Sequence, residues 1–131
     1  EIKVEGVEVE NLSWSLGREV ADFQSFDVGL YPIVASEWAT GKSGFKSIQY
    51  MAVGVPFVAT PVGASGEIGE PGETHFLATT HDEWRDALTR LLSDATLRRE
   101  MGERGRRHAL ANYTVPAQAD KLAAALREAA A

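Results

Sequence analysis

The chain has 131 residues, of which 44% are hydrophobic and 24% charged, and its formal net charge is −6. These values are ordinary for one folded domain and argue against a disordered chain. The negative net charge argues against a nucleic-acid partner, because acidic proteins repel phosphate backbones. The absence of cysteine excludes disulfide frameworks, thiolate zinc sites and cysteine nucleophiles. Because the chain begins with Glu1 rather than Met, we expect it to be a piece of a longer protein.

The first predicted elements lie before residue 25. Apolar and polar residues alternate over residues 2–9, with Gly6 interrupting them, which predicts two short strand segments around a turn. Ser15 is a suitable N-cap for a short helix. The expected buried face of that helix is Leu16, Val20 and Phe23.

Two continuous apolar runs predict buried strands. Residues 27–31 form the first strand, which Pro32 ends, and residues 57–60 form the second. Residues 33–43 are predicted to be a loop, and a helix follows that Gly54 can end. One face of this helix carries the apolar residues Phe45, Ile48, Met51 and Ala52.

The second half of the chain contains a turn-rich stretch over residues 63–72, a short strand over 76–78 and three helices. Thr80 begins the first helix in a capping box, and Asp94 and Thr114 cap the next two. The residues expected to face inward are Trp84, Leu88, Leu91 and Leu92 in the first helix, Leu97 and Met101 in the second, and Val115, Ala119, Leu122 and Leu126 in the third.

The order of these elements predicts the fold class. The two central runs lack polar alternation, so both faces of their strands are expected to be buried. We therefore predict an α/β fold, a Rossmann-like parallel sheet with helices on both faces, followed by C-terminal helices. About four strands are visible where doubly wound domains usually have five or six, so a strand–helix–strand unit is expected to be missing before Glu1.

Two lysines stand apart in an acidic region, since Lys42 and Lys46 are the only cations between Arg18 and Arg85. They lie in a glycine-rich stretch at a predicted helix start, where free backbone N–H groups and the positive end of the helix dipole attract anions. The predicted site for a phosphate or diphosphate comprises Gly41, Lys42, Ser43, Gly44, Phe45 and Lys46. A purely structural helix start with solvated lysines is the alternative.

Other motifs fit their chemistry less well. A P-loop would need glycine where Ser36 stands, and a nucleophile elbow would need glycine in place of Glu67. The three histidines lack the spacing of metal ligands. The glutamates of the stretch 63–73 are typical of solvated turn residues, with paired catalytic carboxylates as the alternative. In the arginine-rich run 98–107, interrupting glutamates favour pairing within the helix.

Several motifs together resemble a known family. The stretches DVGLYP (27–32), GKSGFKSIQYMAVGVP (41–56) and PVG (61–63) are followed by Glu67, and further matches extend to Tyr113. Their order and spacing resemble the family-4, or group 1, glycosyltransferases of the GT-B fold. The resemblance covers nearly the whole chain.

The resemblance implies that residues 1–131 are the C-terminal, nucleotide-sugar-binding domain of a two-domain enzyme, incomplete at its N-terminus. Such enzymes are retaining transferases that move a sugar from a nucleotide diphosphate sugar to an acceptor without a metal or cofactor. The acceptor-binding N-terminal domain of the same protein would be a partner, and the chain alone would be inactive. The backbone N–H groups of Phe45 and Lys46 would meet the donor phosphates. The implied location is cytoplasmic, peripheral at the inner membrane in the full-length protein.

One departure from the family concerns two glutamates, whose positions are occupied here by Gly41 and Gln49. Gln49 keeps a hydrogen-bonding side chain and is expected to hold the donor ribose, while Lys42 would contact sugar or phosphate. No catalytic residue is assigned to this chain. The replacements favour an alternative, a non-catalytic nucleotide- or anion-binding or interaction module with an inherited fold. The truncated sheet would also expose an edge at which a second copy could pair.

Overall fold

Three parallel strands in the order β1-β2-β3 form the centre of a computed structural model that describes residues 2–130. The strands are β1 (Gly29–Tyr31), β2 (Phe57–Ala59) and β3 (Phe76–Leu77). The helices are α1 (Glu19–Gln24), α2 (Glu37–Thr40), α3 (Phe45–Val53), the 3-10 turn η1 (Gly63–Gly66), α4 (His81–Ser93), α5 (Ala95–Asn112) and α6 (Val115–Ala129). This arrangement confirms the predicted α/β class with a Rossmann-like parallel sheet.

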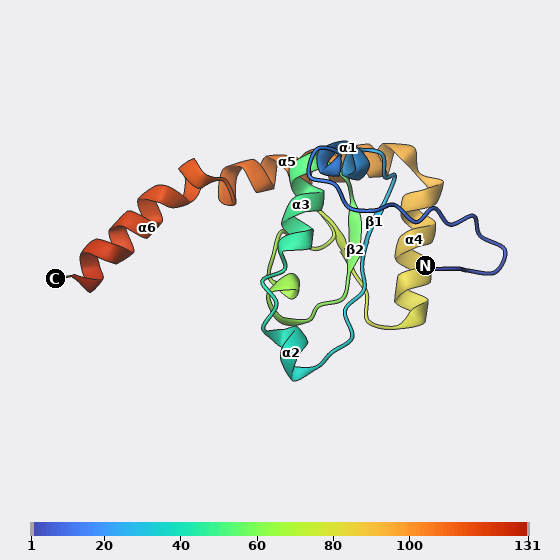
Figure 1. Cartoon of the computed structure of the whole chain (residues 1–131), viewed down its shortest axis with the longest axis horizontal. Coiled ribbons are helices and arrows are strands. Elements are labelled where there is room, and N and C mark those ends of the chain that lie inside the picture. Colours follow the sequence, from blue (N-terminus) through green and yellow to red (C-terminus); the bar gives the residue numbers. More distant parts are fainter. Residues whose placement is uncertain (1, 131) are drawn as a thin grey trace.

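The central strand β2 is buried along its whole length and separates two hydrophobic clusters. Phe57 and Ala59 pack with Tyr50 and Met51 of α3. Val58 packs in the other cluster, which Leu91, Met101 and their neighbours from α4 and α5 complete. Successive side chains of a strand point to opposite faces, so the two clusters confirm the prediction that helices cover both faces of the sheet. In Figure 1, α3 and α4 accordingly lie on opposite sides of the strands.

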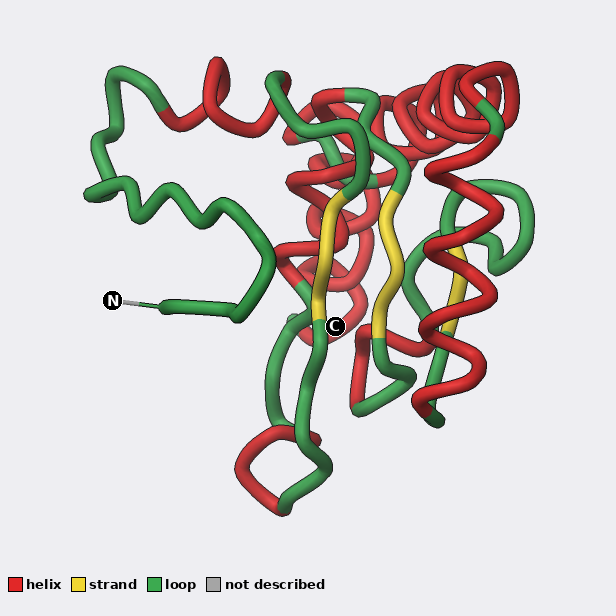
Figure 2. The backbone as a smooth tube through the Cα atoms, turned by 90° about the vertical axis from the view of Figure 1, so that its right-hand side faces the viewer, coloured by secondary structure: helices red, strands yellow, loops and turns green. Residues whose placement is uncertain are grey.

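The edge strand β1 departs from the prediction. Leu30 is 50% exposed, so the expectation that both faces of this run are buried was wrong. β1 pairs with β2 on one side only, and its other edge carries no partner strand within residues 2–130. The N-terminal segment lies beyond this edge without joining the sheet (Figure 2).

The N-terminal segment also differs from its prediction. In place of two strand segments, Val4 and Val7 form an isolated antiparallel bridge around Gly6, whose φ is +74°. A turn that starts at Ser15 precedes α1, so the helix begins at Glu19 rather than directly after Ser15. Leu16 and Val20 are exposed, and of the predicted apolar face only Phe23 packs against the core.

The predicted N-terminal caps of the three helices in the second half of the chain are confirmed. The hydroxyl of Thr80 accepts from the N–H of Glu83 while the carboxylate of Glu83 accepts from the N–H of Thr80, and Asp94 and Thr114 cap α5 and α6 as expected. The inward face predicted for α6 was wrong, because α6 buries no residue and Val115 is 83% exposed. α6 extends away from the sheet and its covering helices (Figure 1), so Ala119, Leu122 and Leu126 also find no core to enter.

His75 is a buried polar residue in the core beside β2. Its ring stacks on Phe57 with centroids 4.7 Å apart, and its Nδ1 lies 2.9 Å from the Thr74 hydroxyl. Within the described residues its Nε2 has no hydrogen-bond partner. Burial, with a smaller effect of nearby His108, lowers the pKa of His75 to about 4. The fold therefore requires the neutral imidazole.

We expect His75 to make the fold sensitive to acid. An unfolded histidine titrates near about 6.5, so stability is complete above that pH and falls as the pH drops towards 4, by roughly 3 kcal/mol in total. The His75→Phe variant should lose this part of the pH dependence in urea unfolding between pH 7 and 4, whereas His81→Phe, at an exposed position, should keep it. An equal slope in His75→Phe and the parent would contradict this assignment.

Candidate functional site

The candidate site lies at the N-terminus of α3, beyond the carboxyl ends of β1 and β2. The last turn of α3 leads through Gly54 into the start of β2. The first turn of α3 therefore lies at the other end of the sheet, where β2 ends and the loop after β2 begins. Gly44 occupies the N-cap with φ +67°, and no side chain within residues 2–130 caps this helix. The first backbone N–H groups of a helix have no partner inside it, so those of Phe45 and Lys46 are free to meet a ligand.

Two glycines allow close approaches to the loop after β2, one at the start of α3 and one at the end of α2. A Cβ on Gly44 would lie 3.2 Å from both the Cα and the N of Ser65, and it would also overlap the side chain of Ile68. A Cβ on Gly63 would overlap the carbonyl oxygen of Thr40, at the end of α2. The buried Ser65 hydroxyl lies 2.7 Å from the carbonyl oxygen of Thr60, which fixes the loop itself. The loops that follow β1 and β2 therefore pack closely against each other.

Lys42 and Lys46 lie against aromatic rings. The Lys42 Nζ lies 4.7 Å from the centre of the Trp38 ring, and the Lys46 Nζ lies 4.7 Å from the centre of the Phe23 ring. Neither lysine forms an ion pair with a carboxylate in the part of the chain that the structure describes. An aromatic face orients an ammonium group without neutralising its charge. Both charges thus remain available to an anion at the uncapped helix.

The predicted site residues fall into two groups. Gly44, Phe45, Lys46 and Gln49 share α3 and its N-cap. Gly41, Lys42 and Ser43 form the connection from α2, a helix that the sequence analysis did not predict and that Ser36 caps by accepting from the N–H of Ala39 at 3.1 Å. Gly41 has φ −79°, a conformation open to other residues, so its backbone geometry does not require glycine.

Gln49 is half-buried and already has a protein partner. Its Nε2 donates to the Oε1 of Glu19 at 2.8 Å, and the indole N–H of Trp14 donates to the Oε2 of Glu19 at 2.5 Å. Sequence reasoning missed Glu19, which stands 30 residues before Gln49. In the sequence near Glu19, the one feature that marks this residue is that it is acidic and stands in the first turn of α1.

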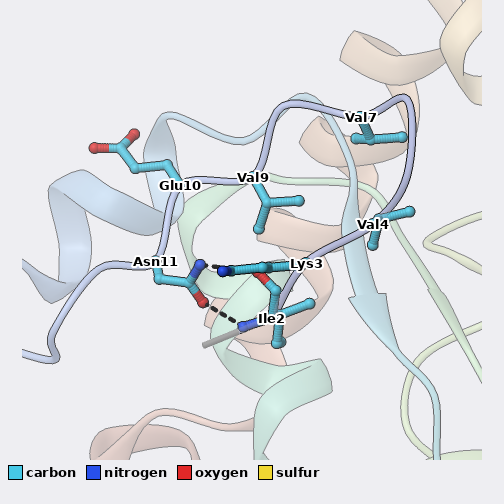
Figure 3. Close-up of a pocket in the computed structure, with 7 residues that line it drawn as sticks. All are labelled: Ile2, Lys3, Val4, Val7, Val9, Glu10 and Asn11. Carbon is cyan, nitrogen blue, oxygen red and sulfur yellow. Dashed lines mark hydrogen bonds between the residues drawn. The ribbon is translucent and has the colours of Figure 1, made fainter.

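Two other hollows among residues 2–130 are less suited to an anion. Figure 3 shows one formed within the N-terminal segment, where the Asn11 amide bonds the backbone N–H and carbonyl of Ile2 at 2.9 and 3.0 Å. A second lies between α5 and the turn before β3, where Glu73 pairs with Arg104 at 3.2 Å and Glu70 lies 3.5 Å from His108. The charged side chains of that second hollow are therefore largely engaged with one another.

Among residues 2–130 there is no group of three or more His, Asp or Glu residues that could hold a metal ion. Within the same residues, no helix is both long enough and apolar enough to cross a bilayer.

Comparison with known proteins gives a consistent family. The family described as glycosyl transferase-like matches residues 17–124, which include every residue of the candidate site. The chain is 35% identical over 113 residues to a D-inositol 3-phosphate glycosyltransferase of Corynebacterium diphtheriae, a match that covers 85% of the chain and 25% of the relative. A protein of the same name from Corynebacterium jeikeium is 35% identical over 100 residues, covering 72% of the chain and 24% of that relative. The chain thus spans about a quarter of the length of the curated relatives it matches.

The packing at Gly44 predicts how two glycine substitutions will differ. Gly54 also has a positive φ, of +80°, but a Cβ there would lie 3.8 Å from its nearest neighbour. Gly54→Ala should therefore cost only the conformational strain, about 1 kcal/mol. Gly44→Ala adds the clash with Ser65 and should cost about 2–3 kcal/mol. Urea unfolding of the two variants tests this, and equal losses would mean that α3 does not rest on the loop as described.

Proposed function

The chain belongs to the glycosyl transferase-like family, within the group 1 glycosyltransferases, and on this premise we propose that it binds the nucleotide diphosphate sugar donor of a longer glycosyltransferase. The observation that carries the proposal is the uncapped N-terminus of α3 flanked by two lysines without carboxylate partners among residues 2–130. A donor diphosphate supplies the charge and the acceptor oxygens that such a site attracts.

Each residue of the site has a role in this proposal. Gly44, Phe45 and Lys46 bind the diphosphate, through two backbone N–H groups and one ammonium group. Lys42, with Ser43 and Gly41 beside it, faces the transferred sugar or the second phosphate. Gln49, one turn further along α3, contacts the ribose. The contacts of both lysines with aromatic rings support these roles, because they hold the ammonium groups near the helix end while leaving their charge free.

Catalysis in this proposal consists of positioning and of stabilising the leaving group. As the bond to the sugar breaks, negative charge grows on the departing diphosphate, and the helix dipole and the two ammonium groups would stabilise that charge. With this positive charge supplied by the protein, we propose a retaining transfer that needs no metal. The acceptor would be bound by the part of the enzyme outside this chain, as the match covers only 25% of the relative's length. No residue of the chain is assigned a catalytic proton transfer.

One observation favours a second function, a nucleotide-binding module without transferase activity. Gly41 offers no side chain to a transferred sugar, and Gln49 is engaged with Glu19. Sugar transfer by the full-length protein separates the two functions. Loss of transfer in Lys42→Ala and Lys46→Ala variants that still fold supports the transferase, and unchanged transfer in both variants removes these lysines from its mechanism. A parent protein that binds a nucleoside diphosphate but transfers no sugar supports the binding module.

The donor site predicts which ligands bind and which lysine they need. In calorimetric titrations of UDP, GDP, ADP and inorganic diphosphate, one nucleoside diphosphate should bind in a saturable way. Lys46→Ala should weaken that binding about tenfold, because a charge-assisted contact to phosphate contributes about 1.5 kcal/mol.

Lys121→Ala is the matched control, since Lys121 lies on α6, far along the chain from the site. The control variant should bind as tightly as the parent. Equal affinities in Lys46→Ala and the parent, or the absence of any diphosphate binding, would contradict the proposed function.

A further inference from the structure

A shallow groove runs along α3 where α1 packs beside it. Its volume is about 240 Å³, less than that of pockets that enclose a whole drug-sized ligand, so an occupant would lie along it rather than inside it. The walls are mainly apolar and come from Val20, Phe23, Phe45, Ala52 and Val53. The polar side chains in the lining are those of Glu19 and Gln49.

The carboxylate of Glu19 is held in an unusual way. Its two oxygens accept from neutral donors, the amide of Gln49 at 2.8 Å and the indole of Trp14 at 2.5 Å. No cation pairs with Glu19 within the described residues. Each carboxylate oxygen has a second lone pair, so the oriented group can still accept two further hydrogen bonds.

We propose that Glu19 binds the ribose hydroxyl groups of the donor nucleotide, and that the apolar groove beside it receives the base. This inference rests on the proposed function, because it takes the diphosphate to lie at Lys46. It adds a ligand residue from α1, a helix that the predicted site did not include. Gln49 then serves mainly to orient Glu19.

The spacing along α3 fits this arrangement. Lys46 lies over Phe23, which lines the groove, so the phosphate end of the ligand is adjacent to the groove entrance. Gln49 and then Ala52 follow at intervals of three residues, each about 4.5 Å further along the helix axis. Phosphate, ribose and base succeed one another at comparable distances in an extended nucleotide, so the three groups meet a cation, a carboxylate and an apolar wall in that order.

A carboxylate is suited to this task because a ribose offers two neighbouring hydroxyl donors. Acidic side chains bind ribose hydroxyl groups in the same way in other nucleotide-binding folds. Gln49 alone would be a weaker acceptor, since a hydrogen bond to a charged oxygen is roughly twice as strong as one to a neutral oxygen. The pair thus places a charged acceptor next to α3 although α3 itself carries none there.

The test compares three probes by calorimetry: the nucleoside diphosphate that binds most tightly among UDP, GDP and ADP, its 2′-deoxy form, and inorganic diphosphate. The parent chain should prefer the ribonucleotide over the deoxynucleotide by about tenfold. Glu19→Gln should lose this preference and should not bind inorganic diphosphate more weakly, because a negative charge has been removed. Asp22→Asn, on the same helix, is the matched control and should behave as the parent.

A double variant distinguishes ligand binding from a merely structural role of Glu19. Glu19→Gln with Gln49→Glu exchanges the carboxylate and the amide, and so keeps both the hydrogen bond between α1 and α3 and a charged acceptor at the groove. It should regain the preference for the ribonucleotide.

The outcomes separate this inference from the proposed function. If inorganic diphosphate binds in a manner that depends on Lys46 while Glu19→Gln keeps the parent's ribose preference, the inference is overturned and the diphosphate site stands. If the double variant discriminates no better than Glu19→Gln, a ligand role for the carboxylate is likewise overturned. If no probe binds the parent chain, both the inference and the proposed function fail.

Discussion

The first turn of α3 can rest on the loop after β2 because Gly44 carries no side chain. The site depends on this contact, since any Cβ at this position would push the helix end away from Ser65 and turn its free N–H groups from the edge of the sheet. Gly63 allows a second close approach, between the same loop and the end of α2. With both ends fixed, the connection that carries Lys42 is short and its course is determined. The buried β2 supplies the rigid base from which these loops leave.

The positive charge of the site is preserved because neither lysine pairs with a carboxylate among the described residues. The chain is acidic overall, so carboxylates are plentiful, yet within the described residues Lys42 and Lys46 lie against rings instead. A salt bridge would give each ammonium group a permanent partner that an incoming phosphate would have to displace. An aromatic ring restrains the side chain at a smaller energetic cost to ligand binding. The acidic surroundings would meanwhile repel anions from the rest of this surface.

Sequence reasoning succeeded where the signals are local. The glycines that bound α3, the capping residues of the last three helices and the buried run of β2 are each encoded within a few residues, and the structure confirms them. It failed where burial depends on a partner: Leu30, Val20 and the apolar residues of α6 fit a buried pattern but face no core among residues 2–130. The short helix α2 was not predicted, because a single capping serine is weak evidence for a helix. The contact between Glu19 and Gln49 joins distant parts of the chain, so no local pattern could reveal it. The roles of the site residues and the cytoplasmic location stay predictions.

The detachment of α6 from the core has a consequence for how the chain unfolds. α6 buries no residue, so its 15 residues are held by their own backbone hydrogen bonds, by the Thr114 cap and by the Gln118 side chain, which donates to the carbonyl oxygen of Asn112. A helix of about this length is only marginally stable in water without packing. Its amide protons should therefore exchange with solvent through local helix–coil opening, while those around Met101 and Ala109 of α5 exchange only when the core opens. A single unfolding free energy thus describes the sheet with α3, α4 and α5, and α6 follows an equilibrium of its own.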